Sequence, residues 1–256
     1  MSSQPLTIDL NADLGEGFGV WRLGDDDALL AIVTSANIAC GFHGGDPLTL
    51  RRSCAGAVAR GVAIGAQVSY WDLAGFGRRH MDVPADELTA EILYQIAALD
   101  GIARAEGGRV RYVKPHGALY NRIARDRVQA DAVVAAIAAY DRALPLLTLP
   151  GSAAERAADD AGLPVAAEAF ADRAYTSEGT LVSRGEPDSV LADPDEVAER
   201  AVAMVTRGTV VSADGHEVAL RAQSVCVHGD TPGAVELARA VRKGLETAGV
   251  RLMPFT

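Results

Sequence analysis

The chain has 256 residues, of which 49% are hydrophobic, so it is long and apolar enough to bury one large core. It carries 24 Lys and Arg residues against 34 Asp and Glu residues, which gives a formal charge of −10. Nucleic acids and anionic membranes are bound through basic faces, so this balance argues against both as partners. A local basic pocket is compatible with it, and its candidates are Arg78, Arg79 and Lys114.

The sequence shows no sign of export or membrane insertion. The first residues, MSSQPLT, contain neither the basic nor the apolar segment of a secretory signal. No stretch approaches the roughly 18 apolar residues that a membrane-spanning helix needs. The three cysteines, Cys40, Cys54 and Cys226, have neither zinc-site nor disulfide-framework spacing. We therefore expect a cytoplasmic protein whose cysteines are small buried side chains.

Seven short apolar runs recur along the chain, and most of them end in a polar cluster. Continuous apolar runs of this length are typical of strands buried on both faces, as in parallel sheets covered by helices. We therefore predict strands at Leu6–Leu10, Ala36–Cys40, Val62–Val68, Val110–Val113, Leu144–Leu149, Val165–Phe170 and Ser224–Val227.

The segments between these runs have helical periodicity. In Asp86–Ala105 the apolar residues recur at spacings of three or four, Pro84 marks a start, and Gly107 marks a stop. Asp126–Ala139 and Pro194–Thr206 are predicted to be helices as well.

Two further elements are predicted near the carboxyl end of the chain. Pro232–Ala248 is the last predicted helix, with Thr231 as a candidate N-cap and Gly249 just past its end. Before it, Thr209–Ser212 and Glu217–Leu220 flank an Asp-Gly turn signal, which predicts a β-hairpin.

Strands interleaved with helices predict an α/β fold with a parallel sheet, built as one domain over residues 1–256. The region from about 174 to 223, which contains the hairpin, is predicted to be an insertion. Periodicity alone does not separate an open doubly wound sheet from a closed barrel, so both architectures stay open at this point.

Polar and glycine-rich residues gather where the predicted strands end. In parallel β/α folds, ligands bind at the carboxyl ends of the strands because the βα loops converge there. Four of the five histidines lie at or near such ends, which predicts a hydrolase-like site. The polar residues at these ends are Asn11, Asp13, Glu16, His43, Asp46, Lys114, His116, Asp172, Arg173, His228 and Asp230.

Some of these residues also have a purely structural interpretation. Asp13 and Glu16 could cap a helix, and Asp230 could be only a turn residue. His80 and His216 lie in loops where exposure to solvent is the default expectation.

Carboxylates together with histidines suit two kinds of hydrolysis. In one, an Asp and two His residues bind a divalent ion that lowers the pKa of its water towards ~7. In the other, a His or Asp acts as general base on an amide without a metal, and Lys114 or backbone amides stabilise the oxyanion. The sequence has no HExxH, GxSxG or Walker A motif, so ATP handling would need a different loop or a partner protein.

Six segments that hold these residues follow one another along nearly the whole chain. They are IDLNADLGEGFG from Ile8, SANIACGFHGGDP from Ser35, GFGRR from Gly75, VKPHGALYN from Val113, FADRAYTSEGTLVSR from Phe170 and CVHGDTPGA from Cys226. Together they resemble the LamB/YcsF family, and six long segments in the right order are far more specific than a single glycine motif.

The resemblance implies a seven-stranded parallel β/α barrel similar to that of the glycoside hydrolase/deacetylase superfamily. It also implies cleavage of 5-oxo-L-proline to L-glutamate coupled to ATP hydrolysis, with the chain acting as one subunit of a 5-oxoprolinase beside partner subunits B and C. ATP, with Mg²⁺, would then be handled through those partner subunits.

With this resemblance, catalysis is expected at Asp13, His43, His116 and His228. Asp13 or His116 would position or deprotonate water, and His43 or His228 would protonate the leaving nitrogen. Arginine suits bidentate binding of a carboxylate or phosphate. Substrate binding is expected at Asn11, Glu16, Asp46, Arg78, Arg79, Lys114, Asn121, Asp172, Arg173 and Asp230.

Three positions depart from the family pattern. Gln67 stands where the family usually has a histidine, Val68 replaces its proline, and Ala12 replaces the cysteine of many relatives. In the related deacetylases that histidine is a metal ligand, and a neutral amide is a much poorer one. We therefore predict no metal in this chain; a metal, if bound, would have to use Asp13, His43 and His116.

Two other functions stay open at this point. The chain could be a metal-dependent deacetylase or amidohydrolase that acts alone, which a stoichiometric divalent ion would favour. It could also be a non-catalytic subunit that binds a small carboxylate, which an active Asp13→Ala variant of the complex would favour.

Overall fold

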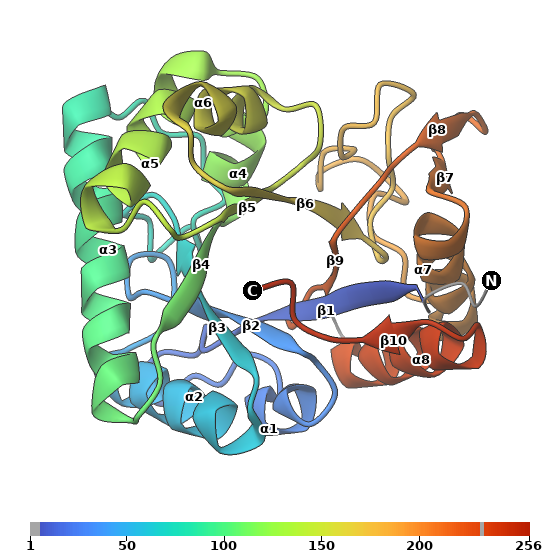
Figure 1. Ribbon diagram of the computed structural model, residues 1–256, viewed down its shortest axis with the longest axis horizontal. Coiled ribbons are helices and arrows are strands. Elements are labelled where there is room, and N and C mark those ends of the chain that lie inside the picture. Colours follow the sequence, from blue (N-terminus) through green and yellow to red (C-terminus); the bar gives the residue numbers. More distant parts are fainter. Residues whose placement is uncertain (1–5, 231–232) are drawn as a thin grey trace.

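In the computed structural model, which describes residues 6–230 and 233–256, seven parallel strands form a closed barrel (Figure 1). The last barrel strand pairs with the first through Asp9–Ala12 and Ser224–Val227, which closes the ring. The predicted barrel is therefore confirmed, and the open sheet is excluded. In barrel order the strands are β1 (Thr7–Leu14), β2 (Ser35–Ala39), β3 (Ala63–Val68), β4 (Val110–Pro115), β5 (Leu146–Thr148), β6 (Val165–Phe170) and β9 (Ser224–Val227).

The first strand is longer than predicted, because it continues past Leu10 to Leu14. Its residues alternate in chemistry, and successive side chains of a strand point to opposite faces. Ile8, Leu10, Ala12 and Leu14 pack into the main apolar core. Asp9, Asn11 and Asp13 are buried on the other face and hydrogen-bond to residues of other barrel strands. The interior of the barrel is therefore polar along β1.

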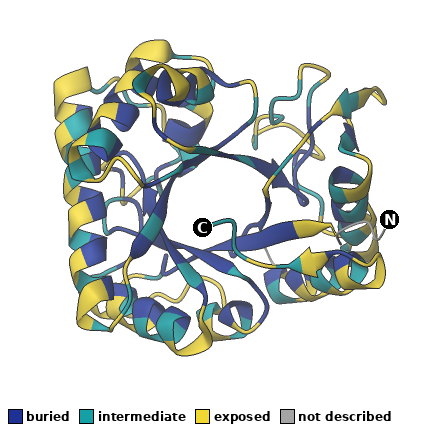
Figure 2. Ribbon diagram, viewed as in Figure 1, coloured by how far each residue is buried: buried dark blue, intermediate teal, exposed yellow. Residues whose placement is uncertain are grey.

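The helices surround the barrel and expose their outer faces, while the barrel strands are largely buried (Figure 2). The predicted helices at 86–105, 126–139 and 194–206 are confirmed to within one residue at either end. The last helix begins at Ala234 with Gly233 in the N-cap position, and its predicted start at Pro232 with Thr231 lies outside the described residues. The helices are α1 (Asp26–Leu30), α2 (Pro47–Arg60), α3 (Ala85–Ala105), α4 (Gly117–Ile123), α5 (Arg127–Tyr140), α6 (Ala153–Ala161), α7 (Pro194–Thr206) and α8 (Ala234–Thr247).

The segment between β6 and β9 departs from the simple strand–helix alternation. It first forms an irregular wall at the carboxyl end of the barrel, where Arg173 bridges to Val190 and Tyr175 bridges to Leu181. It then continues into α7 and into the predicted hairpin, which is present as antiparallel β7 (Thr209–Val211) and β8 (Glu217–Ala219).

The other end of the barrel is covered by the last residues of the chain. Strand β10 (Arg251–Leu252) pairs with the start of β1, and the Phe255 ring packs 5.0 Å from the Tyr112 ring. The carboxyl end is thus the end left for a ligand. The three cysteines are buried and free, as predicted. Within the described residues, no helix combines the length and apolar character that crossing a membrane requires.

Candidate active site

A cavity of about 1110 Å³ opens at the carboxyl ends of the strands. Its floor contains Asp13 of β1, Lys114 of β4 and Phe170 of β6, together with His116 and His228, which directly follow β4 and β9. Its outer wall is formed by α4 and by residues 176–186, which we call the strap. The cavity lies where the loops of a parallel barrel converge, as the sequence predicted.

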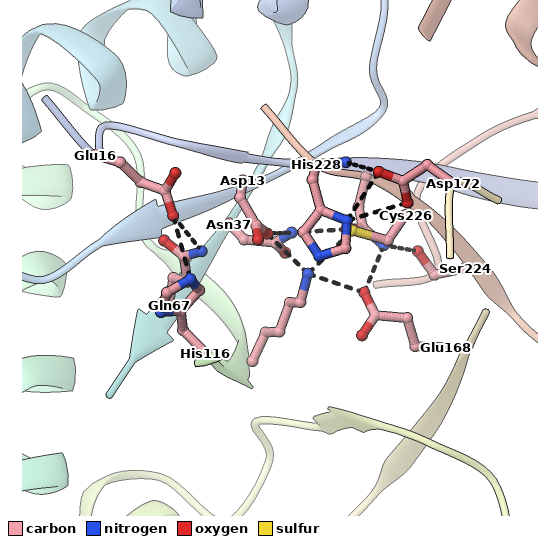
Figure 3. Close-up of polar contacts among 12 residues, drawn as sticks. Asp13, Glu16, Asn37, Gln67, His116, Glu168, Asp172, Ser224, Cys226 and His228 are labelled. Carbon is pink, nitrogen blue, oxygen red and sulfur yellow. Dashed lines mark hydrogen bonds and ion pairs between the residues drawn. The ribbon is translucent and has the colours of Figure 1, made fainter. Parts of the chain in front are cut away.

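A chain of hydrogen bonds runs up the barrel interior to this floor (Figure 3). The Asn37 amide donates to Asn11 Oδ1 at 2.6 Å and to Asp13 Oδ1 at 2.8 Å. The Tyr112 hydroxyl donates to Asn37 Oδ1 at 2.6 Å, and the Asn11 amide donates to Glu168 at 3.1 Å. Asn11, predicted to bind substrate, is fully buried, does not line the cavity and shares the Asn37 amide with Asp13.

Asp13 and Lys114 form a buried ion pair, with Lys114 Nζ 2.8 Å from Asp13 Oδ1 and 3.2 Å from Glu168 Oε1. Burial alone would raise the pKa of the Asp13 carboxyl, but the charges of Lys114 and His228 and two hydrogen bonds lower it to about 2. Burial raises the pKa of Glu168, an effect that Lys114 only partly opposes. The carboxylate of Asp13 is therefore held ionised beside the cavity.

The Lys114 ammonium has three N–H donors, and three partners surround it. Besides Asp13 and Glu168, Cys226 Sγ lies 3.1 Å from Lys114 Nζ. Binding a ligand through Lys114 would require breaking one of these contacts. Lys114 thus positions Asp13 in this structure, and its predicted role in anion binding stays a prediction.

His228 is fixed by Asp172, whose carboxylate oxygens lie 3.0 and 2.9 Å from His228 Nδ1. The backbone N–H of His228 also donates to Asp172 Oδ2 at 3.2 Å. With Nδ1 as the donor to this carboxylate, Nε2 is the ring nitrogen left as a base. Asp172, predicted to bind substrate, thus acts through His228. Asp13, Lys114, Glu168, His228 and Asp172 are called the Asp13 cluster below.

A second group, the Glu16 cluster, consists of Glu16, His43, Gln67 and His116. Glu16 Oε1 lies 3.6 Å from His43 Nε2 and 3.7 Å from His116 Nε2. The Gln67 amide donates to the same Glu16 oxygen at 2.9 Å, and its carbonyl lies 3.3 Å from His43 Nε2. Only His116 of this cluster lines the cavity, and His43 lies behind it with no exposed surface.

Gly77 lets the loop after β3 cover this cluster. The backbone φ of Gly77 is +64°, a region that side-chain-bearing residues rarely adopt. A Cβ at this position would lie 2.9 Å from His43 Cβ and 3.1 Å from His116 Nδ1. The two imidazoles are therefore enclosed by backbone, and burial, followed by the charge of His43, lowers the pKa of His116 well below its usual value.

Glu16, His43 and His116 each place a potential ligand atom within 4.8 Å of the other two. The predicted metal set used Asp13 in place of Glu16, and this is corrected because Asp13 Oδ1 is bonded to Lys114 and Asn37. The donor types fit a divalent cation.

The arrangement of the His43 and His116 rings does not fit a bound divalent cation. The two imidazoles stack with centroids 4.1 Å apart and an interplanar angle of 20°, so their nitrogen lone pairs lie alongside each other instead of converging. Metal-bound histidines usually donate their second N–H to a partner, but both Nδ1 atoms are buried without one among the described residues.

The predicted arginines lie in different places. Arg78 lines the cavity and pairs with Asp230 at 2.6 Å, so both predicted residues lie at its edge. Arg79 pairs with Asp72 and its side chain is 66% exposed, so its predicted role in substrate binding is not supported by its position. Asp46 caps α2 by accepting from the backbone N–H of Leu48 at 2.9 Å, and this structural role corrects the predicted one.

The remaining predicted residues are at the wall of the cavity. Arg173 is buried and donates to the carbonyls of Ser189 and Val182, which fixes the strap. Asn121 is exposed at the rim and donates to Gly117 O at 3.1 Å. His80 is exposed but lines the cavity, whereas the exposed His216 lies in the hairpin turn away from it.

Several residues of the site were not predicted, among them Glu168, Asn37 and Arg184. Glu168 lies inside an apolar run, and a carboxylate within a buried strand is a signal that could have identified it. Asn37 shares the same signal in β2. Arg184 of the strap follows no strand end, and no local pattern could have placed it in the cavity.

The LamB/YcsF family model matches residues 8–256 of the chain. The A subunit of a 5-oxoprolinase from Streptomyces avermitilis is 62% identical over 248 residues, which cover 97% of this chain and 99% of that protein.

Solved structures agree with this match. A lactam utilization protein from Thermus thermophilus is 48% identical and superimposes with a TM-score of 0.93, covering 98% of this chain and 100% of that one. A family 4 carbohydrate esterase from Streptomyces lividans is 13% identical with a TM-score of 0.54, covering 98% of this chain and 93% of that one, which shows a likeness of fold alone. The chain belongs to the LamB/YcsF family.

Proposed function

We propose that the chain is the A subunit of a multi-subunit 5-oxoprolinase and that its barrel carries the hydrolytic step from 5-oxo-L-proline to L-glutamate. Relatives at 62% and 61% identity, both named as the A subunit of 5-oxoprolinase, support the subunit role. The substrate and the chemistry are argued from the cavity.

The observation that carries the proposal is that Asp13 and His228 line one cavity, each fixed from behind by a buried partner. Lys114 holds the Asp13 carboxylate ionised, and Asp172 orients the His228 ring. A fixed carboxylate and a fixed imidazole can position a water molecule and exchange its proton with an amide nitrogen. Opening a lactam by hydrolysis requires groups of these two kinds.

The lactam of 5-oxoproline is a planar, unstrained amide and a poor electrophile. In the proposed reaction, ATP bound with Mg²⁺ through partner subunits B and C phosphorylates the lactam oxygen. Water then adds to the ring carbon, the carbon–nitrogen bond breaks, and the nitrogen leaves as an amine that has taken both water protons. The acyl phosphate formed in this way reacts with a second water to give glutamate and inorganic phosphate.

In this reaction, Asp13 orients the attacking water, and His228 takes its proton and returns it to the nitrogen. His116, which is neutral because burial lowers its pKa, is the member of the Glu16 cluster that contacts the substrate. Arg78, at the edge of the cavity, binds the substrate carboxylate.

The test is ATP-dependent formation of glutamate from 5-oxoproline by the chain assembled with subunits B and C. Asp13→Asn is expected to lower the rate by about 100-fold or more, the scale of a lost acid–base group. Asp131→Asn, an exposed position on α5, is the matched control and should keep full activity. A wild-type complex that forms no glutamate would refute the function. An active Asp13→Asn complex would instead indicate a non-catalytic binding subunit.

A second candidate, a metal-dependent amidohydrolase that acts alone, is supported by the donor types of Glu16, His43 and His116. Metal analysis of the purified chain separates the two. One tightly bound divalent ion per chain, lost in His43→Ala, would favour the second candidate. A chain without such an ion that works only with its partners would favour the first.

A further inference from the structure

The cavity has the opposite charge balance from the rest of the chain. Its lining contains six Lys and Arg residues against three Asp and Glu residues, whereas the whole chain has 24 against 34. A positive cavity in an acidic protein concentrates anions. The basic lining residues are Arg78, Lys114, Arg122, Arg125, Arg173 and Arg184.

The cavity is also larger than one lactam needs. Cavities of about 300–1000 Å³ accommodate drug-sized ligands, and this one has about 1110 Å³. A five-membered ring with one carboxylate fills only the inner end beside Asp13 and His228. The outer end, between α4 and the strap, is left for another part of the ligand.

Most of the basic groups already have acidic or carbonyl partners. Lys114 is held by Asp13 and Glu168, and Arg122 donates to Asp126 at 2.6 Å. Arg173 donates to two carbonyls and fixes the strap. The donors of these groups are already used in contacts within the protein, so we do not assign them to a further anion.

Two arginines of the outer end, Arg125 and Arg184, form no ion pair with any residue that the structure describes. Among the described residues, Arg125 donates only to the neutral Thr180 hydroxyl, at 3.1 Å, and this bond joins the turn after α4 to the strap. Arg184 forms no hydrogen bond or ion pair with any residue that the structure describes. Arg78 differs from both, because it pairs with Asp230 and its guanidinium lies over the Phe76 ring, which packs against His116 at the inner end.

Arg78 and Arg184 lie close enough to Arg173 to repel its charge. The pKa of the Arg173 guanidinium is lowered to about 10, first by burial and then by the charges of Arg184 and Arg78. Like charges gathered at one wall of a cavity destabilise each other unless an anion lies between them.

We propose that Arg184 and Arg125 form a phosphate subsite at the outer end of the cavity, distinct from the Asp13 cluster. Its ligand is the phosphoryl group of a small phosphorylated substrate, which guanidinium groups bind in a bidentate manner. In assigning the lactam to the inner end, the inference rests on the proposed function. The substrate class of this chain is then a phosphorylated lactam, delivered already activated.

Calorimetric titration of the purified chain with inorganic phosphate and with 5-oxoproline, each alone and in the presence of the other, tests the subsite. The ionic strength is kept constant because salt screens exposed charges. We expect the two ligands to bind together. Arg184→Ala should weaken phosphate binding about tenfold or more and leave 5-oxoproline binding unchanged. Arg184→Lys keeps the charge but loses the bidentate donor geometry of the guanidinium. Its phosphate affinity should therefore lie between those of the wild type and Arg184→Ala.

The matched control is Arg239→Ala, an exposed position on α8 that does not line the cavity, and it should bind phosphate like the wild type. Thermal unfolding of each variant confirms that it is folded.

Competition between phosphate and 5-oxoproline, with Arg184→Ala weakening both, would overturn the inference, because the arginines would then bind only the substrate carboxylate. Absence of phosphate binding at millimolar concentration would overturn it as well. These failures differ from failure of the proposed function, since glutamate formation by the complex is measured separately.

Discussion

The Asp13 cluster and the Glu16 cluster both lie at the carboxyl end of the barrel, and they stabilise their buried groups in different ways. In the Asp13 cluster, Lys114 neutralises a carboxylate, and the pKa of Asp13 falls to about 2. In the Glu16 cluster, a neutral amide, Gln67, contacts the carboxylate, and burial raises the pKa of Glu16.

This difference shows what one charged partner does to a buried carboxylate. A cation offsets the desolvation of Asp13 and leaves an ionised group at the cavity, whereas burial raises the pKa of Glu16. The Asp13 cluster is therefore suited to stabilising charge and binding water in the cavity, and the Glu16 cluster is suited to a structural role. The predictions below test this division.

The largest effect is expected on catalysis, from His228→Asn. It removes the imidazole that exchanges protons with the nitrogen, so the glutamate-forming rate of the complex should fall by about 100-fold or more. His116→Asn should lower the same rate by about tenfold, because His116 is the one member of the Glu16 cluster that lines the cavity. The steady-state rates of both variants are compared. A greater loss of rate in His116→Asn would indicate that the Glu16 cluster carries the chemistry.

Lys114→Met tests the charged partner through stability. It leaves Asp13 and Glu168 buried without their cation, and the free energy of unfolding should fall by about 3–5 kcal/mol. Urea denaturation at pH 7 measures it, with the exposed Lys243→Met as the control. A loss below about 1 kcal/mol would mean that the ion pair contributes little against its own desolvation.

The pH dependence of stability should follow the lowered pKa of Asp13. Because the pKa falls from 3.8 to about 2 on folding, the carboxylate contributes stability above pH 4, and this is lost as the pH falls towards 2. The contribution is about 2 kcal/mol. Urea denaturation from pH 4 to pH 2.5 should show a smaller slope in Asp13→Asn than in the wild type. An equal dependence of unfolding free energy on pH in the two proteins would mean that another group titrates in this range.

Glu16 should behave with the opposite sign. Its raised pKa means that its contribution is present below its unfolded pKa and is lost as the pH rises through the folded value. Glu16→Gln should therefore reduce the loss of stability on going from acidic to neutral pH, measured in the same way.

The smallest effect is expected from Gln67→Leu. Removing the amide leaves Glu16 and His43 without a neutral hydrogen-bond partner, which costs about 1–2 kcal/mol of unfolding free energy. Urea denaturation beside Lys114→Met compares the two clusters directly. A loss as large as that of Lys114→Met would show that the neutral partner is as important as the charged one.

Much of the site could be predicted from strand-end position. Asp13, Lys114, His116 and His228 lie at the ends of predicted strands or just beyond them, and all four line one cavity. Their partners could not be predicted in this way. Glu168 lies within a strand, and Asp172 contacts His228 across 56 residues. The carboxylate that lies beside His43 and His116 is set by the path of the chain after β1. It belongs to Glu16, whereas Asp13 was expected there.

The sequence by itself determined where the seven barrel strands, the hairpin and four of the helices lie, because hydrophobic periodicity is local. Residues that alternate as Ile8-Asp9-Leu10-Asn11 fix which side chains point into the barrel wherever the strand lies.

Only the tertiary structure decided that the sheet closes, since the pairing of β1 with β9 joins the two ends of the barrel. The same closure brings Lys114 to Asp13 across 101 residues and folds the strap over the cavity. Charge compensation and the cationic outer wall depend on distances in space, and no local pattern encodes those distances.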